Sequence, residues 1–247
     1  MRDERVNRRP QVPQPAPGRA LAFIEDYIRD RVLPFYANTH TEASATGRHT
    51  TALREDARRV IHRAVNGTAD DVVLFCGSGS TAAVDTLIRV LELGQRGSRP
   101  VVFVGPYEHH SNELPWRESA AEIVTIREDG DGRVDLAHLD SELRRRAGRT
   151  LKVGSFSAAS NVTGIVTDVE GVSERLRRHG ALSCWDYAAA GPYLPVGMTG
   201  KDAVFLSPHK FVGGPGTAGV LVAKRAAVSQ PGSVGAGRRH GPVRDPG

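Results

Sequence analysis

The sequence contains little cysteine and no long apolar run. Only Cys76 and Cys184 occur among its 247 residues, and each lies inside a short apolar stretch. This pattern is typical of reduced, buried thiols and argues against the disulfide framework of a small secreted domain. No uninterrupted apolar stretch has the length needed to span a membrane, and the N-terminus lacks the hydrophobic core of a signal peptide. The predicted location is therefore cytoplasmic.

Aromatic side chains are also scarce, at 6% of residues, although Lys and Arg outnumber Asp and Glu by 33 to 28. This excess of positive charge would suit a nucleic-acid partner. The arginines, however, cluster along predicted helices, as at Arg58, Arg59 and Arg63, with no aromatic residues between them. A protein that binds single strands stacks the bases on aromatic rings, so these arginines indicate solvated helix faces and no nucleic-acid partner is expected.

The two ends of the chain differ in composition from its middle. Residues 1–18 are rich in Arg, Pro and Gln, and residues 229–247 are rich in Gly, Pro and Arg. Such segments bury too little apolar surface to offset the entropy lost on ordering, so both are predicted to be disordered. Residues 19–50 are predicted to hold a helix that ends at Pro34 and then a polar loop. The loop could line a site, but a simple connection is the plainer interpretation.

The middle, residues 51–228, alternates helical periodicity with short apolar runs. An amphipathic helix is predicted from Thr51 to the Asn66-Gly67 stop. Strands are predicted at 72–75, 101–104, 123–126, 151–157, 181–185, 203–206 and 217–222, and helices at 80–93, 135–147 and 169–178. Strands that are apolar throughout and alternate with helices predict one α/β domain, with a mostly parallel sheet covered by helices on both faces.

Ligands of such sheets bind at the carboxyl ends of the strands, so the residues that follow each strand are the candidates for a site. After the first strand, Gly77-Ser78-Gly79-Ser80-Thr81 opens a helix. Its N–H groups, hydroxyls and helix dipole could hold a phosphate, or the loop could simply cap the helix. It matches neither the Walker A motif nor the dinucleotide fingerprint.

Two later loops carry polar side chains suited to a flat ligand. His109 and His110 follow the second strand, but adjacent side chains point apart and no third ligand lies at a recognisable spacing, so no metal is predicted. An imidazole over a flat cofactor ring is the favoured use. Asn161, after the strand at 151–157, could donate to an oxygen of the ring or merely hold a turn.

The last two loops add an acid and a lysine. Asp186 follows Trp185 at a strand end, where a carboxylate is costly unless it is paired. A protonated ring nitrogen would pair with it, although a turn cap is the alternative. Lys210, in Ser207-Pro208-His209-Lys210, ends the next loop before a glycine-rich stretch. A desolvated lysine can form an imine with an aldehyde, so the pattern suggests pyridoxal phosphate, against the alternative of a surface lysine beside a turn.

Taken together and in this order, the motifs resemble the class V aminotransferase superfamily, and most of all its cysteine desulfurase and selenocysteine lyase group. The resemblance runs from about Leu33 to Lys224, with Asp186 placed 24 residues before Lys210. It implies the architecture of fold type I pyridoxal-phosphate enzymes, a homodimer and a small amino-acid substrate that reacts through Schiff-base and carbanion chemistry.

The resemblance also implies a role for each matched residue. Lys210 would link to the cofactor and move the proton at the substrate's α-carbon, and Asp186 would keep the ring nitrogen protonated. His109 would stack on the ring and assist proton transfer, and Asn161 would contact the ring's phenolic oxygen. The phosphate would be held by the remaining residues of the matched motifs: Gly79, Ser80, Thr81, Ser207 and His209.

Two departures from the family pattern concern the reaction. Ala189 stands where close desulfurases carry a glutamine, three residues after the aspartate. The chain also ends where the family continues into a smaller domain, which carries the arginine for the substrate carboxylate and the mobile nucleophilic cysteine, so a truncated product is expected. A transaminase, another lyase, a catalytically silent cofactor-binding fragment and a generic phosphate-binding protein stay as alternatives.

Overall fold

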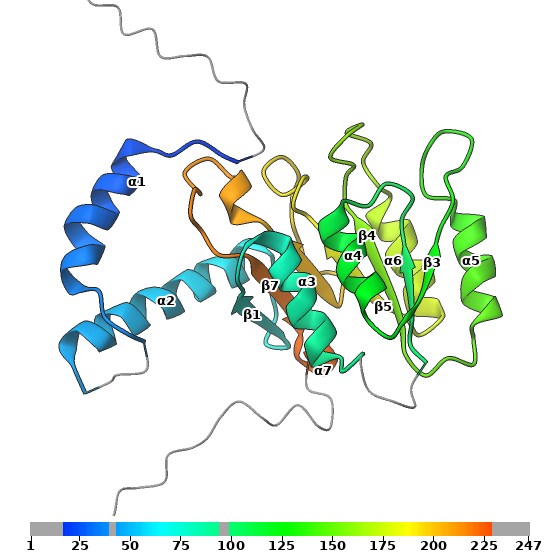
Figure 1. Cartoon of the computed structure of the whole chain (residues 1–247), viewed down its shortest axis with the longest axis horizontal. Coiled ribbons are helices and arrows are strands. Elements are labelled where there is room, and N and C mark those ends of the chain that lie inside the picture. The colour runs from blue at the N-terminus through cyan, green and yellow to red at the C-terminus, as the bar shows by residue number, and fades with distance from the viewer. Residues whose placement is uncertain (1–16, 40–42, 94–98, 229–247) are drawn as a thin grey trace, which may run out of the picture.

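The computed structural model describes residues 17–39, 43–93 and 99–228, and these residues form a seven-stranded sheet with helices on both faces (Figure 1). The strands are β1 (Asp71–Phe75), β2 (Val101–Val104), β3 (Glu122–Thr125), β4 (Lys152–Ser157), β5 (Leu182–Asp186), β6 (Ala203–Leu206) and β7 (Val220–Lys224). Their spatial order is β1-β7-β6-β5-β4-β2-β3. The predicted α/β class is confirmed, because β3, β2, β4, β5 and β6 pair in parallel.

One strand runs against the others. β7 is antiparallel to both of its neighbours, β6 and β1, so β1 points in the same direction as the parallel strands. At this edge Asp71 lies opposite Lys224 in register, and the two side chains form an ion pair at 2.9 Å. The carboxyl ends of β1, β2, β4, β5 and β6 therefore all lie along one border of the sheet.

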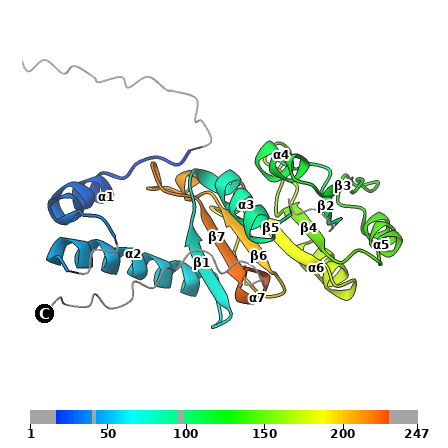
Figure 2. The same cartoon turned by 60° about the horizontal axis from the view of Figure 1, so that its bottom comes forward.

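Two helical layers cover the sheet and divide the core into two clusters (Figure 2). The helices are α1 (Ala22–Tyr27), α2 (Ala45–Ala64), α3 (Gly79–Val90), α4 (His110–Glu118), α5 (Leu136–Arg145), α6 (Val169–Arg178) and α7 (Arg225–Val228). Leu87 of α3 and Trp116 of α4 are fully buried on one face, and Leu139 of α5 and Leu176 of α6 on the other. Both faces of β2 and β6 are buried, which explains their uninterrupted apolar sequences.

The N-terminal helices extend beyond the edge of the sheet (Figure 1), and the C-terminal end of α2 packs against β1, where Ile61 and Val65 join the core. After α1 the helix continues as a π-helical turn, Ile28–Val32, and a 3₁₀ turn that contains Pro34. The helix predicted from Thr51 begins earlier, at Ala45, because the side chain of Ser44 accepts a hydrogen bond from the Gly47 N–H and caps it.

The predicted disordered segments fall almost entirely outside the described residues. Of residues 1–18 the structure describes Pro17 and Gly18, and the Gly18 N–H donates to the His209 carbonyl oxygen at 2.8 Å. The predicted tail, 229–247, is not among the described residues. No helix in the described part of the chain is long and apolar enough to cross a membrane.

Candidate functional site

The loops that follow the carboxyl ends of β1, β2, β4, β5 and β6 bring the predicted site residues together. Lys210 occupies a 3₁₀ turn, Pro208–Lys210, directly after β6, and its N–H donates to the Ser207 carbonyl oxygen at 2.9 Å. It lines a cavity of about 400 Å³ together with Asn161 and Ala189. Asn161 is exposed at the cavity's edge, on the loop after β4.

The start of α3 is fixed by the loop that carries Lys210. The Ser80 N–H donates to the Ser207 hydroxyl at 2.8 Å, and both residues are buried. Ser78, at the N-cap position, makes no capping hydrogen bond with its side chain. The Ser78 side chain therefore satisfies none of the backbone N–H groups at the start of α3. Thr81 is exposed on the same turn.

Gly79 lets this turn approach its neighbours closely. Its φ of +59° lies in the left-handed region, which favours glycine. A Cβ at this position would lie 2.9 Å from Cε1 of His209 and 3.2 Å from Oγ of Ser207. The predicted phosphate residues thus form one cradle, built from the start of α3 and the loop after β6.

Asp186, the last residue of β5, is a buried carboxyl group with a turn-capping role. Its Oδ1 accepts the Ala188 N–H at 2.8 Å, and the residue is only 3% exposed. Burial raises the pKa of Asp186 to about 6, while the Ala188 N–H, Lys210 and the Ser80 hydroxyl act in the opposite direction. Asp186 therefore caps a turn and also lies near Lys210. A role as a turn cap and a role as the partner of a protonated ring nitrogen are compatible.

His109 is held in one orientation at the start of α4. Its Nδ1 accepts the Ser111 N–H at 3.1 Å and lies 2.8 Å from the Ser111 hydroxyl. Because Nδ1 is an acceptor, the proton of the neutral ring resides on Nε2. Burial lowers the pKa of His109, and the nearby Lys210 and His110 lower it further. The Ser111 hydroxyl is in turn 3.5 Å from that of Ser80, which links His109 to the cradle.

Sequence reasoning assigned no role to several polar residues behind these groups. Glu108, Ser111, Asn112 and Ser157 form hydrogen bonds directly beneath the site. A carboxylate immediately before two histidines was the available signal, but its partner Ser157 lies 49 positions away in the chain, and only the fold brings the two together.

The Cys184 thiol is not suited to act as a nucleophile. Cys184 is buried in the middle of β5, and burial, together with Asp202, raises the pKa of its thiol well above the ordinary value. Cys76 is half-buried just after β1. Both thiols are free.

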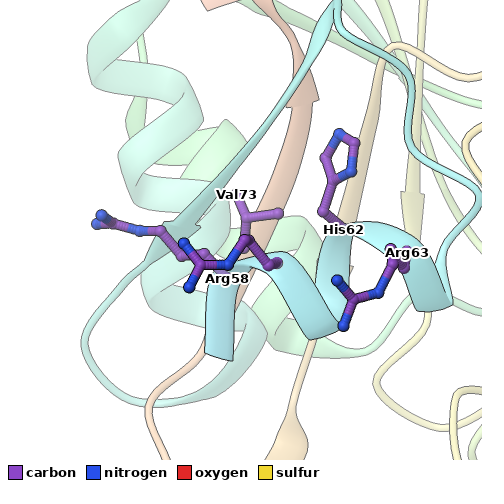
Figure 3. Close-up of a pocket in the computed structure, with 5 residues that line it drawn as sticks. Arg58, His62, Arg63 and Val73 are labelled. Atoms are coloured by element: carbon purple, nitrogen blue, oxygen red, sulfur yellow. The ribbon is translucent and has the colours of Figure 1, made fainter. Parts of the chain in front are cut away.

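A second depression, about 350 Å³, lies over α2 and β1 and contains no predicted site residue (Figure 3). Its rim carries Arg58, His62 and Arg63. Arg58 pairs with Glu55 and lies 5.6 Å over the Phe75 ring, and His62 Nε2 bonds to a backbone carbonyl. Two of these side chains already have partners. We therefore interpret the depression as the space between arginines that pack along the edge strand β1, and not as a binding site.

Comparison with known proteins gives consistent results. A family model described as aminotransferase class-V matches residues 14–240. A probable cysteine desulfurase of Aeropyrum pernix is 33% identical over 210 residues, 82% of this chain and 49% of that protein. One of Halalkalibacterium halodurans is 26% identical over 212 residues, covering 83% and 50% respectively. The chain thus spans about half the length of the curated relatives it matches.

Solved structures support the same fold. A NifS-like protein from Rickettsia africae has a TM-score of 0.75 at 21% identity, over 90% of this chain and 60% of that one. An apo cysteine desulfurase from Thermococcus onnurineus has a TM-score of 0.70, also at 21% identity, over 85% and 52%.

Proposed function

The chain belongs to the class V aminotransferase family, and from that premise we propose that it binds pyridoxal phosphate through Lys210. The observation that carries the proposal is the convergence of Lys210 and Asp186, two residues distant in sequence, at one border of the sheet. Lys210 is close enough to lower the pKa of the buried Asp186 carboxyl group. A lysine for covalent attachment and an acid for the ring nitrogen are the pair that this cofactor requires.

The side chains around this pair fit the cofactor's chemistry. The open start of α3 offers N–H groups and the positive end of a helix dipole to the phosphate, with the side chains of Ser80 and His209 beside it. A buried carboxylate at Asp186 complements a protonated ring nitrogen. His109, locked by Ser111, presents a flat ring, and Asn161 presents an amide at the cavity edge.

When bound, pyridoxal phosphate supplies an aldehyde for attachment and a ring that accepts electrons from the substrate's α-carbon. The chain's own residues would do the rest. Lys210 would take and return the proton at the α-carbon, and the ionised Asp186 would keep the proton on the ring nitrogen. The cradle of Gly79, Ser80 and Ser207 would fix the phosphate and so orient the reacting groups.

We propose a small amino acid as the substrate and desulfurase-like chemistry as the reaction, in line with the relatives named above. One observation favours a second candidate. Ala189 lines the cavity beside Lys210, at the position where close desulfurases carry a glutamine, and the Cys184 thiol is buried inside β5. A transaminase or another lyase of the same family would need neither group. Assays of sulfide and of keto-acid release, with cysteine and with alanine as substrates, separate the two candidates.

Cofactor binding is tested by spectroscopy. The purified protein is expected to acquire the visible absorption of lysine-linked pyridoxal phosphate, and Lys210→Ala is expected to lose it. Lys201→Ala is the matched control, because Lys201 is a half-buried lysine outside the cavity, where its ammonium group lies 3.4 Å from the Thr199 carbonyl oxygen and 6.0 Å from the centre of the Tyr187 ring. Absence of the band from the unmutated protein would falsify the proposal. A band that is retained in Lys210→Ala would show that the cofactor is attached to another lysine.

We further propose a cytoplasmic homodimer. Large apolar side chains are exposed along the N-terminal segment, at Phe23, Leu33, Phe35 and Tyr36. Exposed apolar surface of this kind is typical of an interface with another protein surface. Light scattering of the purified chain tests the proposal, since a monomeric mass at micromolar concentration would contradict it.

A further inference from the structure

The loop that carries Lys210 has little regular structure of its own. Its 3₁₀ turn, Pro208–Lys210, is only three residues long, and so short a turn is marginal by itself. Gly213, Gly214 and Gly216 follow it, and the first and last of these have φ values of +81° and +76°. Glycine loses much conformational freedom when it is ordered. Contacts from another part of the chain are therefore needed to hold Lys210 in one position.

These contacts come from residues 18–24, a segment near the N-terminus that we call the strap. The Gly18 N–H donates to the His209 carbonyl oxygen at 2.8 Å, and the Gly213 N–H donates to the Arg19 carbonyl oxygen at 2.7 Å. In the described part of the chain, both backbone hydrogen bonds that join residues 208–216 to a distant segment are made by the strap. Lys210 lies between these two points of attachment.

Gly18 allows the strap to lie directly on the backbone of the loop. A Cβ at this position would be 1.8 Å from the Phe211 carbonyl oxygen and 3.1 Å from the Lys210 carbonyl oxygen. Backbone atoms cannot yield to a side chain at such distances unless the two segments separate. The two hydrogen bonds thus depend on the absence of a side chain at position 18.

Apolar contacts extend the strap along the loop. A Cβ at Gly213 would lie 2.6 Å from Cδ1 of Ile24 and 3.2 Å from Cδ1 of Leu21, so both side chains rest on this glycine. Ile24 is half-buried, whereas the other residues of α1 are exposed. The part of α1 that is shielded from solvent is therefore the part that faces the loop.

We propose that the strap is a positioning segment, which holds Lys210 at the cavity by fixing the backbone on both sides of it. The inference rests on the proposed function. None of the described strap residues is among those that line the cavity of about 400 Å³ with Lys210, so the strap acts through the lysine loop. A ligand that attaches only to the ordered loop binds more weakly in proportion to the fraction of ordered molecules. The strap would raise that fraction.

The hold of the strap on the loop is tested without cofactor, by amide hydrogen exchange of the apo protein measured by NMR. Gly18→Ala separates the two segments, so exchange at the Gly213 amide is expected to rise about tenfold, while exchange within β6 stays the same. Glu25→Ala is the matched control, because Glu25 is next to Ile24 in α1 but is exposed. It should leave exchange at Gly213 unchanged.

The effect on Lys210 is tested by titration with pyridoxal phosphate, followed through the visible absorption of its link to the lysine. Half-saturation is expected at about tenfold higher concentration in Gly18→Ala and at an unchanged concentration in Glu25→Ala. A strap that only adds packing would alter exchange at Gly213 and leave half-saturation where it is. The titration therefore distinguishes positioning of the lysine from a merely structural contact.

The outcomes also separate this inference from the proposed function. Unchanged exchange at Gly213 in Gly18→Ala, or faster exchange with unchanged half-saturation, would overturn the positioning role. If exchange rises but the unmutated protein shows no visible band, the proposed function fails and the strap stands as the segment that orders the loop. Should Gly18→Ala fail to fold, Ile24→Ala removes only the apolar contact and is expected to raise both quantities about threefold; no change in either would overturn the inference.

Discussion

At the scale of single residues, Gly79 is the position where the backbone itself shapes the site. It combines a left-handed φ of +59° with a Cβ direction that points at the His209 ring. Any side chain there would be strained and would also push His209 out of the cradle. The glycine is therefore required by two separate constraints, one on conformation and one on space.

Replacing this glycine tests the cradle. Gly79→Ala is expected to cost about 1–2 kcal/mol of folding stability and to weaken cofactor binding about tenfold, because the cradle must open to admit the methyl group. Urea denaturation and a fluorescence titration with pyridoxal phosphate give the two quantities. Gly132→Ala is the control for φ alone, since its φ is +74° and the nearest atom to a Cβ is 3.7 Å away. Equal loss of cofactor affinity in the two variants would contradict a cradle at Gly79.

Single residues also show which parts of the site can be predicted from the sequence. The polar residues that directly follow strands could be named in advance, because parallel strands deliver their carboxyl ends to one border. Glu108 could not be given a role, because its position depends on Ser157 and on the space left by Gly105. Interactions of this second kind arise from packing between distant segments, which neither spacing nor composition encodes.

At the scale of elements, the strands have a local sequence signal, whereas one helix and the direction of one strand depend on interactions between distant segments. Every predicted strand is present, because short apolar runs bounded by turns are a local signal. Helix α4 was not predicted, because Pro115 lies inside it and a proline normally argues against a helix interior. The helix survives because its start is capped by His109 and its core residue Trp116 is fully buried. The reversed direction of β7 also has no local signal, since it is set by pairing with β1 and β6.

The contact between β4 and α6 yields a prediction about element packing. Gly154 in β4 lies beneath Leu176 of α6, and a Cβ there would be 2.4 Å from a Leu176 methyl carbon. Both residues are fully buried, so Gly154→Ala should force α6 away from the sheet and destabilise the protein by about 1–3 kcal/mol. Urea denaturation measures the change. Gly148→Ala, where nothing lies within 4 Å, should change stability by less than about 0.5 kcal/mol, and a comparable loss there would show that the Gly154 effect does not come from packing.

At the scale of the whole molecule, acids that pair with arginine differ from the acids under the site. Glu122 and the buried Glu142 both pair with Arg146, and these contacts hold the pKa of each carboxyl below its usual range. The two acids under the site show the opposite behaviour, because burial raises the pKa of Asp186 to about 6 and that of Glu108 to about 7. Burial therefore outweighs the hydrogen bonds at Asp186 and Glu108, whereas the arginine contacts outweigh burial at Glu142.

This contrast predicts how stability depends on pH. An acid whose pKa is raised by folding binds its proton more tightly in the folded state, so its contribution is complete below its unfolded pKa and is lost as pH rises through its folded pKa. For Glu108 and Asp186 the loss falls between about pH 4 and 8. The free energy of unfolding of the apo protein, measured by urea denaturation, should therefore drop by roughly 1–3 kcal/mol more between pH 5 and 8 than that of Glu108→Gln. The acids paired with arginine titrate alike in both proteins, so their contribution cancels in the difference. Parallel stability curves for the two proteins would show that Glu108 ionises as freely in the folded chain as in the unfolded one.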